Sequence, residues 1–127
     1  MNINKRLSQI AEIEFSDIVE MAEESEDKLR IYLIDESYID VWFSRKMEGR
    51  YAYHWERGHI DGKIYRHDNI PHKRWEYVKT FPKHFHNGNE NEVGESSISD
   101  NPAEAIKEVL EFVRKSINFQ SSFSMGR

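Results

Sequence analysis

The chain has 127 residues, which is enough for one domain with its own hydrophobic core and too few for two. It contains no cysteine, so disulfides, thiol nucleophiles and cysteine-ligated metal sites are excluded, and a reducing cytoplasm is the expected location. The net charge of -5 is unevenly distributed, because residues 45–86 carry ten Lys/Arg against five Asp/Glu while the segments on both sides are acidic. All six histidines lie in this basic segment, which favours a phosphate or carboxylate ligand there unless it is only a solvated face.

The first segment predicts a short helix over about residues 1–14, because Ile3, Leu7 and Ile10 recur at helical spacing. Looser alternation over residues 17–24 predicts a strand, with a helix as the competing interpretation. No stretch of the chain approaches the roughly 18 apolar residues of a membrane-spanning helix, and the N-terminus lacks the apolar region of a signal peptide. We therefore expect a soluble, uncleaved protein.

Period-two alternation then predicts an antiparallel sheet. Residues 29–33 and 39–43 each place apolar side chains on one face, and the polar turn between them predicts a β-hairpin. Residues 50–56 and 63–68 predict a third and a fourth strand, joined by a connection that ends in Asp-Gly, a strong hairpin signal. These segments form the centre of the expected fold.

The connection between the third and fourth strands decides which side chains meet. If Asp61-Gly62 is a two-residue turn, His54 and His67 share one face of the sheet. A bulge at Gly58 would shift the register and separate them.

The chain beyond residue 68 predicts a long polar loop, interrupted by a short strand near residues 77–81. Long ordered loops in compact domains tend to be functional. Residues 101–118 predict a C-terminal helix, because Asn101 can cap it, Pro102 suits its first position and an apolar stripe follows.

The expected fold class is α+β, in a single domain that spans residues 1–127. Its antiparallel sheet of four to six strands, together with the histidine-rich loop, occupies residues 17–86. The N-terminal and C-terminal helices flank this sheet.

Imidazole titrates near neutral pH, so two histidines can supply the base and the acid for RNA cleavage while a fixed cation stabilises the charge on phosphorus. This chemistry requires no metal or cofactor, and we predict none. The residues that fit these roles are four histidines and two cations: His54, His72, His84, His86, Arg66 and Lys83. Asp68 could orient one histidine, or it could only form a turn with Asn69.

Two other classes of function stay open. On an extended segment, His84 and His86 project to the same side, and His72 or Asp68 could complete the ligand set of a metal-dependent hydrolase. The domain could also be a non-catalytic module that binds another protein through its sheet.

Aromatic residues are frequent, and exposed ones among basic residues could stack on nucleobases, although in sheets such residues more often form the core. The chain has no glycine-rich phosphate loop and no nucleophile elbow, which argues against a nucleotide-cofactor enzyme.

Three segments occur in order: Tyr-x-Tyr-His-Trp, Arg-x-Asp-Asn-x-Pro-His and Phe-Pro-x-His-x-His. In this joint pattern, over about residues 29–113, the chain resembles the TumE-type toxins of prokaryotic toxin-antitoxin systems. The chain departs from the family pattern at His67 and Lys73, where many relatives carry Trp and a second His. The matching residues are Tyr53, His54, Trp55, Arg66, Asp68, Asn69, Pro71, His72, Phe81, Pro82, His84 and His86.

The resemblance implies a cytoplasmic toxin with a cognate helix-turn-helix antitoxin as its partner. By analogy with small toxins that cut mRNA or tRNA, we predict a metal-independent ribonuclease. The residues assigned to nucleic-acid contacts are Tyr53, Trp55, Asn69 and Lys83. We predict no membrane association, and a homodimer stays open.

Overall fold

The computed structural model describes residues 2–125, with side chains described through residue 118. The elements follow in the order α1 (Ile3–Glu14), β1 (Val19–Glu24), β2 (Leu29–Leu33), β3 (Tyr38–Phe43), β4 (Tyr51–Arg57), α2 (Gly58–Asp61), β5 (Lys63–Asp68), the 3-10 turn η1 (Lys73–Trp75), β6 (His84–Gly88), β7 (Val93–Glu95) and α3 (Pro102–Met125). The α+β class and the two flanking helices are confirmed.

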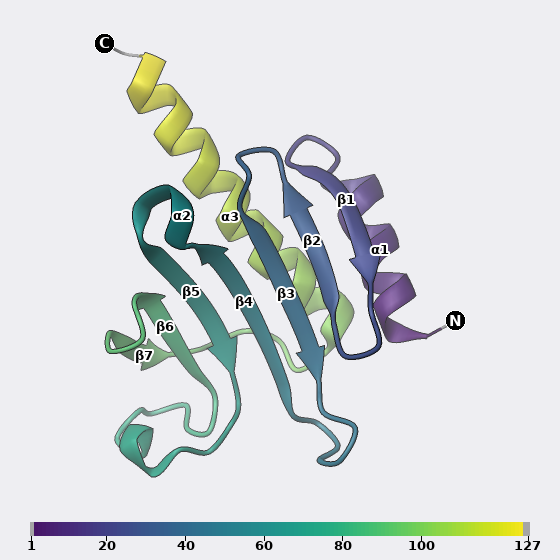
Figure 1. The fold of residues 1–127 in the computed structure, drawn as a ribbon. Coiled ribbons are helices and arrows are strands. Elements are labelled where there is room, and N and C mark those ends of the chain that lie inside the picture. Colours follow the sequence, from purple (N-terminus) through teal and green to yellow (C-terminus); the bar gives the residue numbers. More distant parts are fainter. Residues whose placement is uncertain (1, 126–127) are drawn as a thin grey trace.

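The sheet is a seven-stranded antiparallel meander in which every strand pairs with the next one along the chain (Figure 1). It has more strands than the four to six expected, because the His-x-His segment forms β6 and a short β7 pairs with it. The prediction of a strand near residues 77–81 is wrong. Those residues form successive turns, in which Val78 N–H donates to Trp75 O and Phe81 N–H to Val78 O.

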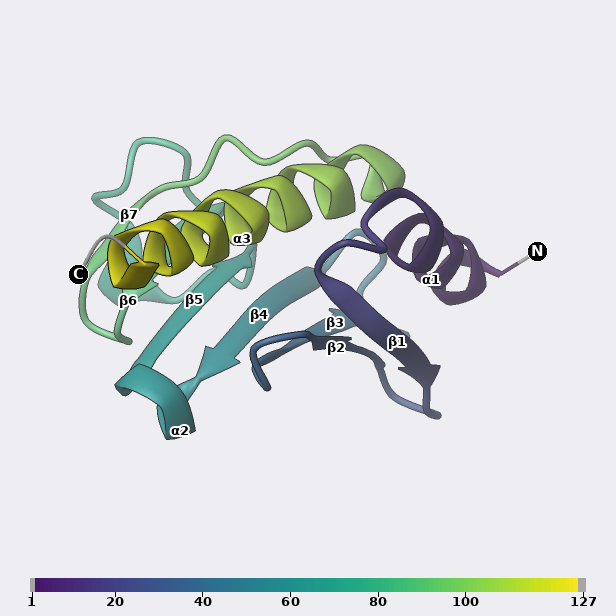
Figure 2. The same cartoon turned by 90° about the horizontal axis from the view of Figure 1, so that it is seen from above.

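Both long helices lie on the same face of the sheet (Figure 2). The helix α1 buries Leu7, Ile10 and Ala11, and α3 buries the stripe Ile106, Val109, Leu110, Val113 and Ile117. Each such side chain contributes about 1.5–3 kcal/mol when it is fully buried, so this layer is the main source of stability. The opposite face, which carries no helix, is called the open face below. Within the described residues, no helix has the length and apolar character needed to cross a membrane.

The register between β4 and β5 differs from the one predicted. Residues 58–61 form the helical turn α2, and Gly62 ends it in the left-handed conformation with φ of 76°. This longer connection pairs His54 with Arg66 and Tyr53 with His67. His54 therefore faces the open side while His67 faces the helices, and the expected sharing of one face by these two histidines is wrong.

The loop between β5 and β6 folds back over the open face. It spans residues 69–83 and contains η1. Its Trp75 is 8% exposed, and its ring centroid lies 6.4 Å from that of His84 and 5.9 Å from that of His86. The loop thus encloses the His-x-His strand.

Candidate functional site

Two cross-strand rows on the open face bring the polar residues together. His54 on β4, Arg66 on β5 and His86 on β6 form one row, because they are direct register partners. Asp68 and His84 pair in the next row. Alternate residues of a strand point to the same face, so all five side chains lie side by side on the open face.

Arg66 is the centre of this group. Its Nε donates to Asp68 Oδ2 at 3.0 Å. Its Nη1 lies 3.3 Å from His54 Nδ1, and its Nη2 lies 3.1 Å from His86 Nε2. Nη1 and Nη2 also donate to the two carboxylate oxygens of Glu90, at 2.8 and 2.6 Å. These contacts use all five N–H donors of the guanidinium, which is therefore held in one orientation.

Glu90 comes from the turn between β6 and β7 and grips the guanidinium with both oxygens. The Arg66 hydrogen bonds lower the pKa of the Glu90 carboxyl, and the Glu90 hydrogen bonds raise the pKa of Arg66. The side chain of Glu90 is 57% exposed, whereas that of Arg66 is 21% exposed. The outer side of this ion pair is therefore open to solvent, and a planar two-oxygen anion already occupies the fork of Arg66.

His86 is held as a neutral ring. Its Nδ1 lies 3.0 Å from the backbone oxygen of Glu90, which can only accept, so the proton is on Nδ1. Its Nε2 then accepts from Arg66. Burial, followed by the charge of Arg66, lowers the pKa of His86. The ring thus presents a lone pair on Nε2 at neutral pH.

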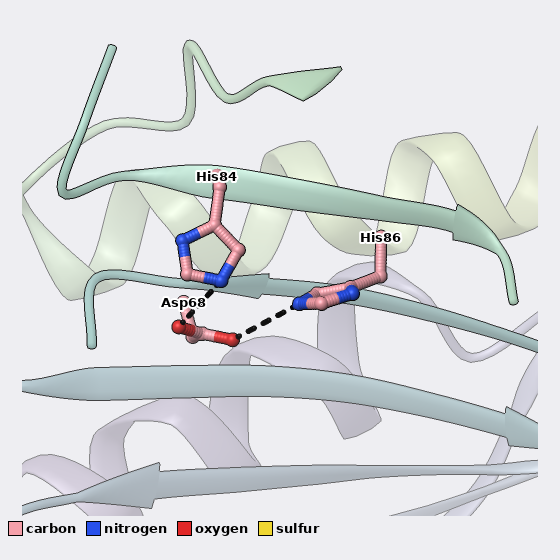
Figure 3. A group of neighbouring side chains, drawn as sticks. All are labelled: Asp68, His84 and His86. Atoms are coloured by element: carbon pink, nitrogen blue, oxygen red, sulfur yellow. Dashed lines mark ion pairs between the residues drawn. The ribbon is translucent and has the colours of Figure 1, made fainter. Parts of the chain in front are cut away.

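His84 is completely buried and faces Asp68 (Figure 3). Its Nδ1 donates to Pro82 O at 2.9 Å, while its Nε2 lies 3.1 Å from Asp68 Oδ1. That second contact has the distance of an ion pair but not hydrogen-bond geometry, and Nε2 has no hydrogen-bond partner among the described residues. Nε2 of His84 is therefore the polar atom of this group that faces the Asp68 carboxylate without a directed hydrogen bond.

His54 lies at the outer side of Arg66. Its Nδ1 accepts from Nη1 of Arg66, so the proton of a neutral ring is on Nε2, which lies 3.2 Å from Glu56 Oε1. The hydrogen bond from His54 contributes to lowering the pKa of Glu56, after the backbone N–H of Gly58. His54 therefore positions the guanidinium.

A hollow of about 300 Å³ opens in front of this group. It is lined by Arg66, Asp68, Ile70, His72, Arg74, Trp75, His84, His86 and Glu90. His72 is exposed at its rim and is not among the hydrogen-bonded residues around Arg66. The predicted residues that come together are thus Arg66, Asp68, His84 and His86, with His54 attached through Arg66.

Asp68, His84 and His86 also form the one group in the described residues that could hold a metal ion, with their ligand atoms within 4.8 Å of one another. Two imidazoles and a carboxylate suit zinc, iron or manganese. However, Arg66 already donates to Asp68 Oδ2 and to His86 Nε2. A metal ion would have to displace the Arg66 guanidinium from Asp68 and His86, two of the three residues that would bind the ion. These three residues therefore fit a metal ion less well than they fit protons and anions. The predicted set with His72 is not brought together.

The four residues assigned to nucleic-acid contacts lie elsewhere. Tyr53 and Trp55 are 3% and 2% exposed in the core beneath α3, where they cannot stack on bases. Asn69 ties the strand ends together, since its Oδ1 accepts from Tyr51 N–H and its Nδ2 donates to Gly49 O. Lys83 pairs with Asp100 at 3.2 Å. The structure shows structural contacts for these residues, and their contacts to nucleic acid stay a prediction.

Two residues of the site were missed. Glu90 lies in a polar loop whose composition indicates only a turn, and nothing local links it to Arg66, 24 positions earlier. In the sequence, Trp75 is one of many aromatic residues. Its position after Pro71, in the longest irregular segment of the basic region, was the available signal that it closes a site.

The same three segments that build this site belong to a known family. A family model described as Toxin TumE matches residues 3–117, which is nearly the whole chain. Comparisons with curated proteins and with solved structures gave no match. Because the match covers α1, the complete sheet and α3 up to residue 117, it applies to the domain as a whole. The chain therefore belongs to the TumE family of toxins, and its function is that of the toxin in a toxin-antitoxin pair.

Proposed function

We propose that this toxin is a metal-independent endoribonuclease that acts in the cytoplasm. Arg66 binds the scissile phosphate, His86 is the general base and His84 is the general acid. The observation that supports this assignment is that two histidines and one arginine line a single hollow, with the Asp68 carboxylate beside His84.

The phosphate enters where the carboxylate of Glu90 lies. A phosphodiester offers two oxygens to a guanidinium in the same forked geometry as a carboxylate. Glu90 is exposed and lies in a short turn, so it can move away without disturbing the sheet. Arg66 keeps its bonds to Asp68 and His54, and the phosphate takes the N–H donors of Nη1 and Nη2 that Glu90 leaves, where the transition state gains charge.

The proton transfers follow from the two ring states. His86 Nε2 exchanges the hydrogen bond from Nη2 for one from the ribose 2'-hydroxyl and takes that proton, and the 2'-oxygen attacks phosphorus. The bond from phosphorus to the 5'-oxygen breaks, and that oxygen takes a proton from His84 Nε2. The products are a 2',3'-cyclic phosphate and a 5'-hydroxyl. His84 enters this step with both ring nitrogens protonated, and the Asp68 carboxylate faces its Nε2 at 3.1 Å.

The antitoxin is proposed to be a helix-turn-helix protein. The support for this is the TumE family itself, which comes from toxin-antitoxin pairs. The acidic segments on both sides of residues 45–86 and the basic segment itself offer surfaces of opposite sign for such a partner.

The function is tested by inducing the toxin in a bacterial host and sequencing RNA ends. Arg66→Ala, His84→Ala and His86→Ala should each lower the yield of new 5'-hydroxyl ends by about 10²-fold or more, the range for losing an acid, a base or an anion-stabilising group. His59→Ala is the matched control, because His59 is exposed in α2, with its Nε2 2.7 Å from Glu36 O.

Unchanged RNA ends in all three variants would remove the acid/base assignment. A folded wild-type protein that releases no fragments would favour the protein-binding module. With the purified toxin, EDTA should leave cleavage intact. If EDTA abolishes cleavage and zinc restores it, the metal site of Asp68, His84 and His86 carries the reaction instead.

A further inference from the structure

The row that contains Asp68 and His84 continues from the site across the open face. Trp42 on β3 pairs with Ala52 on β4, and Ala52 pairs with Asp68 on β5. Asp68 in turn pairs with His84. The indole of Trp42 therefore stands on the same face as the site, two strands away, which is about 10 Å at a strand spacing of about 4.8 Å.

The row between Trp42 and the site carries little side-chain bulk. Ala52 is the residue between them, and its side chain is a single methyl group, so it cannot fill the gap between the indole and Asp68. Trp42 is half-buried and lies on the face that α1 and α3 do not cover. A half-buried aromatic ring next to a small side chain, in line with a phosphate site, can receive a nucleobase on its face.

Charge favours a polyanion at this end of the sheet. Trp42 lies at the end of β3 and Asp68 at the end of β5. His84 lies at the beginning of β6. The β3–β4 turn, residues 44–50, has three Lys/Arg against one Asp/Glu, and the β5–β6 loop, residues 69–83, has four against one. Both segments lie at the same end of the molecule (Figure 1). The basic excess of residues 45–86 is thus concentrated around the row of Trp42, Ala52 and Asp68.

We propose that Trp42 is a base-stacking subsite for single-stranded RNA, which receives the nucleobase of a nucleotide adjacent to the one whose phosphate lies on Arg66. The RNA strand crosses β3, β4 and β5 over Ala52, flanked by the two basic segments. This subsite rests on the proposed function for the position of the phosphate, but it is defined by binding and not by cleavage. Recognition by stacking is tolerant of sequence, since every base has an aromatic face.

The test measures binding of a short single-stranded RNA in which every ribose is 2'-O-methylated, so that cleavage cannot occur. Trp42→Ala should weaken binding roughly 5- to 150-fold, the range found when stacking residues are replaced by alanine. Trp42→Phe keeps an aromatic face and should retain most of the affinity. The matched control is Tyr38→Ala, on the same strand and face, because the guanidinium of Arg30 already covers the Tyr38 ring at 4.0 Å.

A set of oligonucleotides with one abasic position each identifies the stacked base. At one position, the loss of binding free energy from removing the base and the loss from Trp42→Ala should not add, because each change removes the same contact. This readout also separates stacking from a loss of folding, which would weaken binding to every oligonucleotide equally.

Equal affinity of wild type and Trp42→Ala, an equal effect of Tyr38→Ala, or equal losses with and without each base would overturn the subsite. Wild-type protein that binds no RNA at all would overturn it as well. If the oligonucleotide binds through Trp42 but unmodified RNA is not cleaved, the subsite stands and the ribonuclease proposal fails. If RNA is cleaved and Trp42→Ala binds RNA normally, the ribonuclease proposal stands and the subsite fails.

Discussion

Replacing Glu90 with glutamine tests whether its carboxylate holds the place of the substrate phosphate. Glu90 grips Arg66 with hydrogen bonds of 2.8 and 2.6 Å, and any phosphate that uses the same two donors has to displace it. The substitution keeps the size of the side chain and removes its charge. We expect tighter binding of phosphate by Glu90→Gln.

The magnitude follows from two terms. Because Glu90 is 57% exposed, solvent screens the ion pair, and its loss is worth at most about 1 kcal/mol. Removing a negative charge about 5 Å from the entering phosphate adds about 0.8 kcal/mol at a water-like dielectric. Together these give about 1–2 kcal/mol, or roughly a 5- to 30-fold lower Kd. Salt should diminish the difference.

Isothermal titration calorimetry with inorganic phosphate, at low and high salt, measures this change. Glu92→Gln is the matched control, since Glu92 lies in the same turn and loses the same charge, while the fork of Arg66 is filled by Glu90. Equal affinities of Glu90→Gln and Glu92→Gln would show that a general charge effect, and not displacement from Arg66, governs anion binding. Weaker binding by Glu90→Gln than by the wild type would refute the reasoning outright.

Two further predictions concern buried groups of the sheet. Asp68→Asn keeps the acceptor for Ile70 N–H but removes the charge beside His84 and Arg66. We expect kcat/KM for RNA to fall by about 10²-fold or more, while the melting curve stays cooperative. Full activity would exclude an acid at His84 that depends on Asp68. Burial lowers the pKa of His67 to about 4, so the unfolded chain binds this proton first as pH falls, and stability that is present above pH 6.5 is lost toward pH 4. Between pH 7 and pH 5 this loss is about 2 kcal/mol, and urea unfolding of His67→Gln should show a pH dependence weaker by that amount; identical slopes would mean that His67 titrates normally.

The parts of the fold that depend on local patterns could be predicted from the sequence. The hairpin of β2 and β3 follows from alternation around a polar turn, and α3 begins where Asn101 accepts from Ala103 N–H. The register of β5 could not be predicted, because residues 58–61 fold into a helical turn that no hairpin rule anticipates. One residue more or less in that connection exchanges the two faces of the strand.

The site shows the same division. Alternation in β4 alone implies that His54 and its neighbours Tyr53 and Trp55 point to opposite faces, so they could not have shared one site. Which face is covered is decided by α3, whose contact with the sheet is non-local. The grip of Glu90 on Arg66 is also non-local, and composition carries no trace of it.

The β5–β6 loop covers charged and imidazole groups where most small domains would place a minor apolar cluster. Among the ring contacts of the described residues, Trp75 is the only large apolar side chain against the two histidines of β6. Replacing a complete buried ion pair with hydrophobic residues of similar volume is often neutral or stabilising, whereas removing one partner alone is destabilising. Selection of this chain for heat resistance alone should therefore favour apolar residues at Arg66, Asp68 and His84 together, and would remove the charged groups on which the proposed chemistry rests.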